Sequence, residues 1–378
     1  MFLSLYTYGL TGGIEKVCRT FTDVLQDLTE GNSLKKHFTL SLHDGKAKNR
    51  HYQSFGGRIG LFSLSTFKKS LSATTIILSH INLLPLARLI RIVSPKKQII
   101  LFAHGIEVWR PLARWQRDFL SKIEIWAVSN YTADRIKKEH SIDGQNIHVL
   151  NNSLPKDFAL INEDQDLELT TSKYNIRKNS KVLLTVCRLS SAEQYKGYDL
   201  VLQSLKDLIR IYPELRYFIV GKADEAEQKR VENLIVGYKL EEHVTLTGYV
   251  SDAEIRQFYQ LADIFVMPSK GEGFGLVFTE ALVNGCRVLA GNADGSSDAL
   301  LNGEMGLLVN PENAGEIYAG LIQLLNQPLN EIEVKARRDK VIENFGYDKY
   351  LAKAKALLTS APAPEEKIGT GPLLKSGS

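Results

Sequence analysis

The sequence predicts an α/β protein of two Rossmann-like, doubly wound domains that face each other across a cleft. With 378 residues, the chain is longer than one hydrophobic core usually supports, which favours two domains. Short apolar runs bounded by Gly, Ser, Asn or Pro alternate with amphipathic stretches of helical length, as in parallel sheets joined by crossover helices. A polar, acidic segment at about residues 155–180 separates the two halves.

Each half supplies its own strands. In the first half we expect strands within residues 1–6, 74–80, 98–105, 124–129 and 146–152. In the second half we expect them within residues 181–189, 215–221, 243–250, 263–269, 286–291 and 306–310. Because ligands of open α/β sheets bind beyond the carboxyl ends of the strands, the loops after these runs are the place to look for a site.

The same pattern gives the domain boundaries. We expect an N-terminal domain over residues 1–160, a C-terminal domain over 161–345, a last helix over 346–360 and a flexible tail over 361–378. The tail is rich in Pro, Gly and Ser and has almost nothing apolar to bury.

The composition is that of an ordinary globular protein, with 44% hydrophobic and 24% charged residues. A net charge of only +4 and the lack of a basic run interleaved with aromatic residues argue against a nucleic-acid partner. Cys18, Cys187 and Cys286 lack metal-site spacing and fit a reducing compartment. No apolar run approaches the roughly 20 residues that span a bilayer, which favours a cytoplasmic protein, or one bound peripherally at the cytoplasmic membrane face.

The most informative stretch is GEGFGLVFTEAL, residues 271–282, which is expected to run from a loop into a helix after a buried strand. Gly271, Gly273 and Gly275 would let the backbone approach a ligand closely. The amides of Leu276 and Val277 would lie unpaired in the first helical turn, at the positive end of the helix dipole. This arrangement predicts a phosphate-binding site.

Two carboxylates accompany this loop. Glu280 lies about one helical turn after Leu276, where it can accept hydrogen bonds from a pair of sugar hydroxyls, and Glu272 can reach a second polyol group. The combination indicates a sugar nucleotide. Two alternatives stay open, a capped helix with a glycine hinge and a nicotinamide-dependent oxidoreductase, although Leu276 replaces the last glycine of a dinucleotide fingerprint.

The spacing of Glu272 and Glu280, with seven residues between them, resembles the double-glutamate motif of the retaining family 4 glycosyltransferases, which have the GT-B fold. The resemblance extends over most of the chain. It includes TGGIEKV (11–17), FAHGIE (102–107), VSNYTADRI (128–136), VCRLSSAEQYKGYDLVLQSL (186–205), VTLTGYVSDAEI (244–255) and GLLVNPEN (306–313).

The resemblance assigns roles to single residues. It implies that Arg188 and Lys196 bind the donor diphosphate, although either could be an ordinary surface charge. It implies that Glu280 holds the ribose, and that Glu272 holds the hydroxyls of the transferred sugar together with the amides of Phe274 and Gly275.

Further roles follow from the same resemblance. The turn of Gly248, Tyr249 and Val250 would present backbone groups to the base, and Gly12 and Gly13 would approach the diphosphate from the opposite wall. His104, which follows a strand and precedes a glycine, would position the donor sugar and stabilise positive charge at its anomeric carbon; a purely structural histidine is the alternative. Glu15 fits a dipole partner of its own helix as well as a site residue.

The activity implied by the resemblance is transfer of a hexose from a nucleoside-diphosphate sugar to a saccharide or lipid-linked saccharide, with retention, by front-face substitution and without a metal. Such reactions build polysaccharides and glycolipids. Family frequency favours a UDP-sugar, and a guanosine donor stays open because the backbone reads the base. The donor would bind mostly to the C-terminal domain and the acceptor to the N-terminal one, and the last helix would cross back to the first domain. A non-catalytic nucleotide-sugar-binding module of the same fold is the alternative.

Three features depart from this pattern or compete with it. Cys187 replaces the usual glycine before the arginine, and Asp298 stands where many relatives have glutamate. Asp164, Gln165 and Asp166 form an Asp-x-Asp sequence, but it lies in the expected linker, so we expect no metal requirement.

The oligomeric state cannot be read from the sequence, and membrane contact has one signal for it. The segment LLPLARLIRIVSPKK, residues 83–97, has leucines beside Arg88, Arg91, Lys96 and Lys97, with Lys68 and Lys69 close in sequence. It fits either contact with anionic lipids or a core helix with a basic solvent face.

Overall fold

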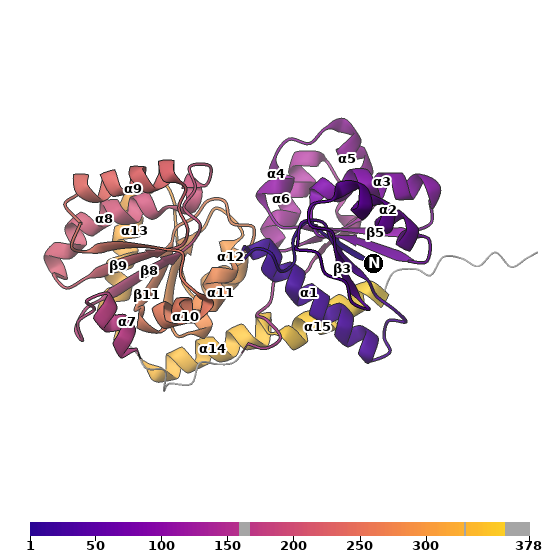
Figure 1. The fold of residues 1–378 in the computed structure, drawn as a ribbon. Helices are drawn as coiled ribbons and strands as arrows, with labels where there is room; N and C mark the ends of the chain where they lie inside the picture. The colour runs from indigo at the N-terminus through magenta and orange to yellow at the C-terminus, as the bar shows by residue number, and fades with distance from the viewer. Residues whose placement is uncertain (159–166, 329, 360–378) are drawn as a thin grey trace, which may run out of the picture.

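The computed structural model describes residues 1–158, 167–328 and 330–359. These residues form two domains, each built on one parallel sheet with helices on both faces (Figure 1). The expected boundary at residues 160 and 161, the Asp164 to Asp166 sequence and the expected tail over 361–378 lie outside the described residues. Two Rossmann-like, doubly wound domains are therefore present, as the sequence predicts.

The N-terminal domain has a seven-stranded sheet in the order β3-β2-β1-β4-β5-β6-β7. Its strands are β1 (Phe2–Ser4), β2 (Thr39–Ser41), β3 (Tyr52–Ser54), β4 (Thr75–Leu78), β5 (Gln98–Ala103), β6 (Glu124–Ala127) and β7 (Ile147–Val149). Its helices are α1 (Gly13–Glu30), α2 (Ile59–Ser70), η1 (Ile81–Leu83), α3 (Leu84–Val93), α4 (Ile106–Trp109), α5 (Arg114–Leu120), α6 (Asn130–His140) and η2 (Gly144–Asn146).

The C-terminal domain has a six-stranded sheet in the order β10-β9-β8-β11-β12-β13. Its strands are β8 (Val182–Val186), β9 (Arg216–Val220), β10 (Val244–Gly248), β11 (Ile264–Met267), β12 (Arg287–Gly291) and β13 (Leu307–Val309). Its helices are α7 (Glu168–Lys173), η3 (Gln194–Lys196), α8 (Tyr198–Ile211), α9 (Glu225–Gly237), α10 (Asp252–Leu261), α11 (Leu276–Val283), α12 (Ser296–Ala299), η4 (Leu301–Gly303), α13 (Ala314–Asn326) and α14 (Glu331–Phe345).

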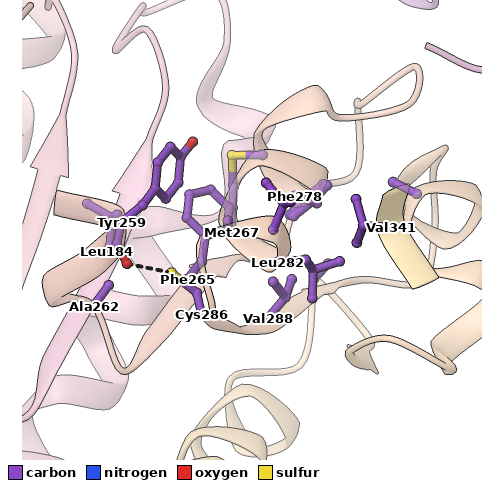
Figure 2. Packing of buried hydrophobic residues seen from close by; sticks show 14 of the residues in the cluster. Leu184, Tyr259, Ala262, Phe265, Met267, Phe278, Leu282, Cys286, Val288 and Val341 are labelled. Atoms are coloured by element: carbon purple, nitrogen blue, oxygen red, sulfur yellow. Dashed lines mark hydrogen bonds between the residues drawn. The ribbon is translucent and has the colours of Figure 1, made fainter. Parts of the chain in front are cut away.

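The central strands consist mostly of buried apolar residues, as expected for parallel sheets with helices on both faces. One face of the C-terminal sheet carries Phe265 and Met267, which pack against Phe278 and Leu282 of α11 (Figure 2). Cys286 closes the same core with its thiol 3.0 Å from the carbonyl oxygen of Tyr259 (Figure 2). This packing fixes α11, the helix that the glycine-rich loop enters.

The last two helices join the domains along one side (Figure 1, yellow). Helix α14 packs on α11, and α15 (Tyr347–Thr359) packs on α1 of the N-terminal domain. Tyr347, Tyr350 and Ala354 are buried in the hydrophobic cluster beneath α1, and the Tyr347 hydroxyl donates to Asp27 at 2.9 Å. The chain therefore returns to the domain in which it began. Among the described helices, none is long and apolar enough to cross a membrane.

Candidate active site

The glycine-rich loop lies where the two domains touch. The carbonyl oxygen of Gly273 accepts hydrogen bonds from Ser129 Oγ at 2.5 Å and Thr132 Oγ1 at 3.3 Å, both at the start of α6 in the other domain. A Cβ atom on Gly273 would lie 1.6 Å from the carbonyl oxygen of His104, after β5. Gly273 is thus required by a contact between domains. The approach of a ligand to its backbone, expected from the sequence, stays a prediction.

The flanking glycines also have structural reasons. A Cβ atom on Gly271 would lie 2.4 Å from the ring of Tyr195. Gly275 precedes α11 with a φ of 86°, in the left-handed region that favours glycine. The loop therefore packs closely against Tyr195, and the backbone conformation of Gly275 sets the direction in which α11 begins.

The start of α11 has the features of an anion site. Within the described residues, no protein group accepts a hydrogen bond from the amides of Leu276 or Val277, the first two residues of the helix. Both amides lie at the positive end of the helix dipole. They are available to a phosphate, as expected from the sequence.

Lys196 and Glu272 form an ion pair beside this loop, with side-chain exposures of 13% and 15%. Burial by itself lowers the pKa of Lys196, but the Glu272 carboxylate outweighs it and holds that pKa above its ordinary value. Lys196 is therefore a protonated, largely desolvated cation. Such a charge interacts with a bound anion more strongly than one in open solvent.

Asp294 accepts a hydrogen bond from the backbone of Glu272. Nothing in the sequence selects it as a site residue. It is buried, and it accepts hydrogen bonds from the backbone amides of Glu272 at 2.7 Å and Ser296 at 2.9 Å. Burial raises the pKa of Asp294 to about 6. Its two acceptor contacts hold the Glu272 backbone in place.

Arg188 is more exposed, at 70% of its side chain, and forms an ion pair with Glu193. That pair raises the pKa of Arg188, and the charge of Glu15 from the other domain acts in the same direction. Cys187 before it is partly buried, and its carbonyl oxygen would lie 1.9 Å from a Cβ atom on Gly221. Arg188 is free to turn toward a ligand because most of its side chain is in solvent.

The start of α1, in the N-terminal domain, lies beside α11, where Lys16 pairs with Glu280. Gly12 precedes the helix in extended conformation, and a Cβ atom there would lie 2.3 Å from a carboxylate oxygen of Glu15. The Glu15 carboxylate thus folds back over the amino end of its own helix, the position of a dipole partner. At Gly13 a Cβ atom would meet nothing within 4 Å.

Glu280 is held by groups from both domains. Its Oε1 pairs with Lys16 Nζ of α1, and its Oε2 lies 3.3 Å from the hydroxyl of Tyr259. Lys16 lies in the stretch TGGIEKV, and nothing in the sequence predicts its pairing with Glu280. This ion pair places Glu280 directly between the two domains.

His104 lies at the carboxyl end of β5 and donates from Nε2 to the carbonyl oxygen of Ser79 at 2.8 Å. Burial lowers the pKa of His104 to about 4, so the ring is neutral at pH 7. Because Nε2 carries the proton, Nδ1 keeps a lone pair that can accept a hydrogen bond from a hydroxyl.

The remaining expected site residues are divided between surface and core. Gly248 has a φ of 68° and accepts a hydrogen bond from the Gly221 amide at 3.1 Å. The side chain of Tyr249 is exposed, and Val250 is buried. Phe274 is buried with its ring centroid 5.2 Å from that of Phe345, so only its backbone can face a ligand.

Asp298, whose role the sequence left open, also spans the domains. It accepts hydrogen bonds from the backbone and side-chain nitrogens of Asn130, both at 2.7 Å, and from the Tyr131 amide at 3.3 Å. These groups begin α6, so Asp298 satisfies the open amides of a helix in the other domain.

Part of the chain resembles a known protein family. Residues 168–344, which carry Arg188, Lys196, Glu272 and Glu280, match the family of glycosyl transferases group 1. This part of the chain is similar to the glycosyl transferases of group 1. It contains both carboxylates and both cations that were expected to bind the donor.

Similar proteins include an uncharacterized glycosyltransferase of Haemophilus influenzae, 29% identical over 180 residues, which make up 47% of this chain and 49% of the relative. They also include the GDP-mannose-dependent alpha-(1-6)-phosphatidylinositol monomannoside mannosyltransferase of Mycolicibacterium smegmatis, 30% identical over 154 residues, or 38% and 39% of the two chains. The chain thus spans about half or less of the length of these curated relatives.

Among solved structures, Anabaena HepE in complex with UDP and glucose superposes with a TM-score of 0.74 at 16% identity, over 95% of this chain and 99% of that one. This likeness shows the fold of two Rossmann-like domains, which is that of the GT-B glycosyltransferases. Within the described residues, no group of three or more His, Cys, Asp or Glu side chains is placed to hold a metal ion.

Proposed function

We propose that this chain transfers a hexose from a UDP-sugar to a saccharide or lipid-linked saccharide, with retention of anomeric configuration and without a metal. The observation that carries the proposal is the Lys196–Glu272 ion pair beside the open amides of α11. A desolvated cation and a helix amino end together suit a diphosphate, and the neighbouring carboxylate suits sugar hydroxyls.

In the proposed reaction, the acceptor oxygen attacks the anomeric carbon on the face from which the diphosphate leaves. The anomeric C–O bond to phosphate breaks, and the acceptor proton passes to the departing phosphate oxygen. Lys196 and Arg188 would neutralise the negative charge that grows on the diphosphate. His104 would orient a donor-sugar hydroxyl through Nδ1 as a neutral acceptor, since its pKa of about 4 leaves it uncharged at pH 7.

The choice of donor rests on the relatives. HepE was solved with UDP and glucose, which supports a UDP-sugar. The mycobacterial relative is named for GDP-mannose and a phosphatidylinositol acceptor, which makes guanosine the competing base and supports a role in glycolipid or polysaccharide synthesis. We favour UDP over GDP as the donor nucleotide, because the likeness to HepE covers 95% of this chain and that to the mycobacterial relative covers 38%.

The reaction can be tested with UDP-glucose and a panel of saccharide and lipid-linked acceptors in the presence of EDTA. We expect transfer to continue in EDTA, and proton NMR of the product to show the anomeric configuration of the donor. Loss of activity in EDTA that Mn²⁺ restores would overturn the metal-free account. An inverted product would overturn retention, and nucleotide binding without turnover on any acceptor would favour the non-catalytic module.

Substitution of Glu280 by glutamine tests the ribose assignment. Loss of the carboxylate charge removes charge-assisted hydrogen bonds to the ribose hydroxyls, so we expect the affinity for UDP to fall about tenfold or more in isothermal titration. Glu242→Gln, at an exposed position, is the matched control. Unchanged UDP affinity in Glu280→Gln would remove Glu280 from the ribose role.

A further inference from the structure

The N-terminal domain exposes a concentrated apolar surface on two neighbouring helices. In the described residues, 17 large hydrophobic side chains are exposed, and eight of them lie on α2 and α3 or at the end of α2. They are Ile59, Leu61, Leu64, Phe67, Leu71, Leu89, Ile92 and Val93. The two helices pack against each other on the side of the domain away from the C-terminal domain (Figure 1), and we call this surface the α2–α3 face. Such concentration marks an interaction surface.

Helix α2 exposes large apolar side chains and buries polar ones. Its exposed side carries Leu64, Phe67 and Leu71, spaced by three and four residues. Its buried residues are one aromatic, Phe62, and two polar ones, Thr66 and Ser70. A helix at a water interface normally shows the reverse, with apolar residues toward the core. The apolar side of α2 therefore lacks a partner in the described part of the chain.

The same region has an unusual charge pattern. Residues 45–106 contain no Asp or Glu, although 43 acids in 378 residues would place about seven there. The stretch has ten basic residues: Lys46, Lys48, Arg50, Arg58, Lys68, Lys69, Arg88, Arg91, Lys96 and Lys97. An acid-free basic segment beside exposed leucines suits an anionic, apolar partner.

Four lysines gather at the end of α2. The ammonium groups of Lys69 and Lys36 lie 3.9 and 4.5 Å from the centroid of the Phe38 ring. Lys48 lines the same surface pocket as Phe38 and Lys69. Burial and the charges of Lys36, Lys48 and Lys68 lower the pKa of Lys69. Within the described residues, none of the four forms an ion pair with a carboxylate. An external anion would relieve this repulsion.

We propose that the α2–α3 face docks the protein on an anionic lipid bilayer, with the leucine and isoleucine side chains in the interface and the lysines on headgroup phosphates. A second copy is a poor occupant, because a symmetric dimer would bring this basic surface against itself. The inference does not depend on the proposed transfer reaction, because it concerns binding alone.

The test is flotation of the full chain with vesicles of phosphatidylcholine, or of phosphatidylcholine mixed with phosphatidylglycerol, without any nucleotide sugar. We expect binding to the mixed vesicles only, and its loss at high salt. Lys68→Gln with Lys96→Gln should lower the partition coefficient by about tenfold or more. Leu64→Gln with Ile92→Gln should do the same by removing inserted apolar area.

Matched controls lie outside the α2–α3 face. Leu169→Gln with Ile332→Gln removes two equally exposed apolar side chains, and Lys178→Gln with Lys229→Gln removes two exposed charges. Both control proteins should bind as the wild type does, and circular dichroism should show that all variants are folded. Equal binding to neutral vesicles, or undiminished binding of either α2–α3 variant, would overturn the proposal. So would a dimer in sedimentation velocity that Leu64→Gln with Ile92→Gln dissociates.

Discussion

Lys196→Ala is expected to lower the rate of transfer by about 10²–10³-fold, because in the proposed reaction this desolvated cation would neutralise the charge growing on the leaving diphosphate. Lys196 is only 13% exposed, so solvent cannot take its place without rearrangement. The effect should appear in kcat, measured under saturating donor and acceptor. UDP affinity should fall less than kcat, since the cation acts most strongly on the transition state.

A neighbouring lysine provides the control. Lys270 lies just before the glycine-rich loop, is 50% exposed and pairs with Glu312. Lys270→Ala should leave kcat within a few-fold of the wild type, because an exposed pair contributes little. Near-normal turnover in Lys196→Ala would show that Lys196 does not stabilise the leaving diphosphate.

Gly273→Ala is expected to reduce transfer by about a hundredfold or more through the contact between domains. The added methyl group would lie 1.6 Å from the carbonyl oxygen of His104, so the loop and the end of β5 cannot keep their positions. Displacement of reacting groups by about 1 Å can cost this much in rate. Steady-state kinetics should be compared with small-angle scattering, which would report a more open pair of domains.

Gly237→Ala is the matched substitution, because a Cβ atom there would meet nothing within 4 Å. It should retain both the wild-type rate and the wild-type scattering profile. If Gly273→Ala also kept the full rate, the contact between Gly273 and His104 would not be needed for transfer.

The fold could be predicted because its central strands are apolar on both faces. Every strand expected from an apolar run is present, including β5 and β8. The strands β2 and β3 were missed because TLS and YQS are mostly polar and offer no apolar run. Both lie on the outer side of the N-terminal sheet, where tertiary packing decides strand formation more than local sequence does.

The site was only partly predictable for a related reason. Glu272 and Glu280 could be selected because their chemistry and spacing lie within one short segment. Lys16, Asp294 and Asp298 act through partners that are distant in sequence, such as Lys16 on Glu280 and Asp298 on the start of α6. A single sequence carries no signal for such pairs. The close contact of Gly273 with His104 could not be predicted for the same reason, since His104 belongs to the other domain.

The return of the chain through α15 makes the C-terminal domain an insertion. Its entry and exit run side by side, because the Leu154 amide donates to the carbonyl oxygen of Phe345 at 2.8 Å. Two adjacent connections favour rotation of one domain relative to the other about a common hinge, and they disfavour a shear motion. Each opening would therefore separate Lys16 from Glu280 and Asp298 from α6 in a single concerted movement.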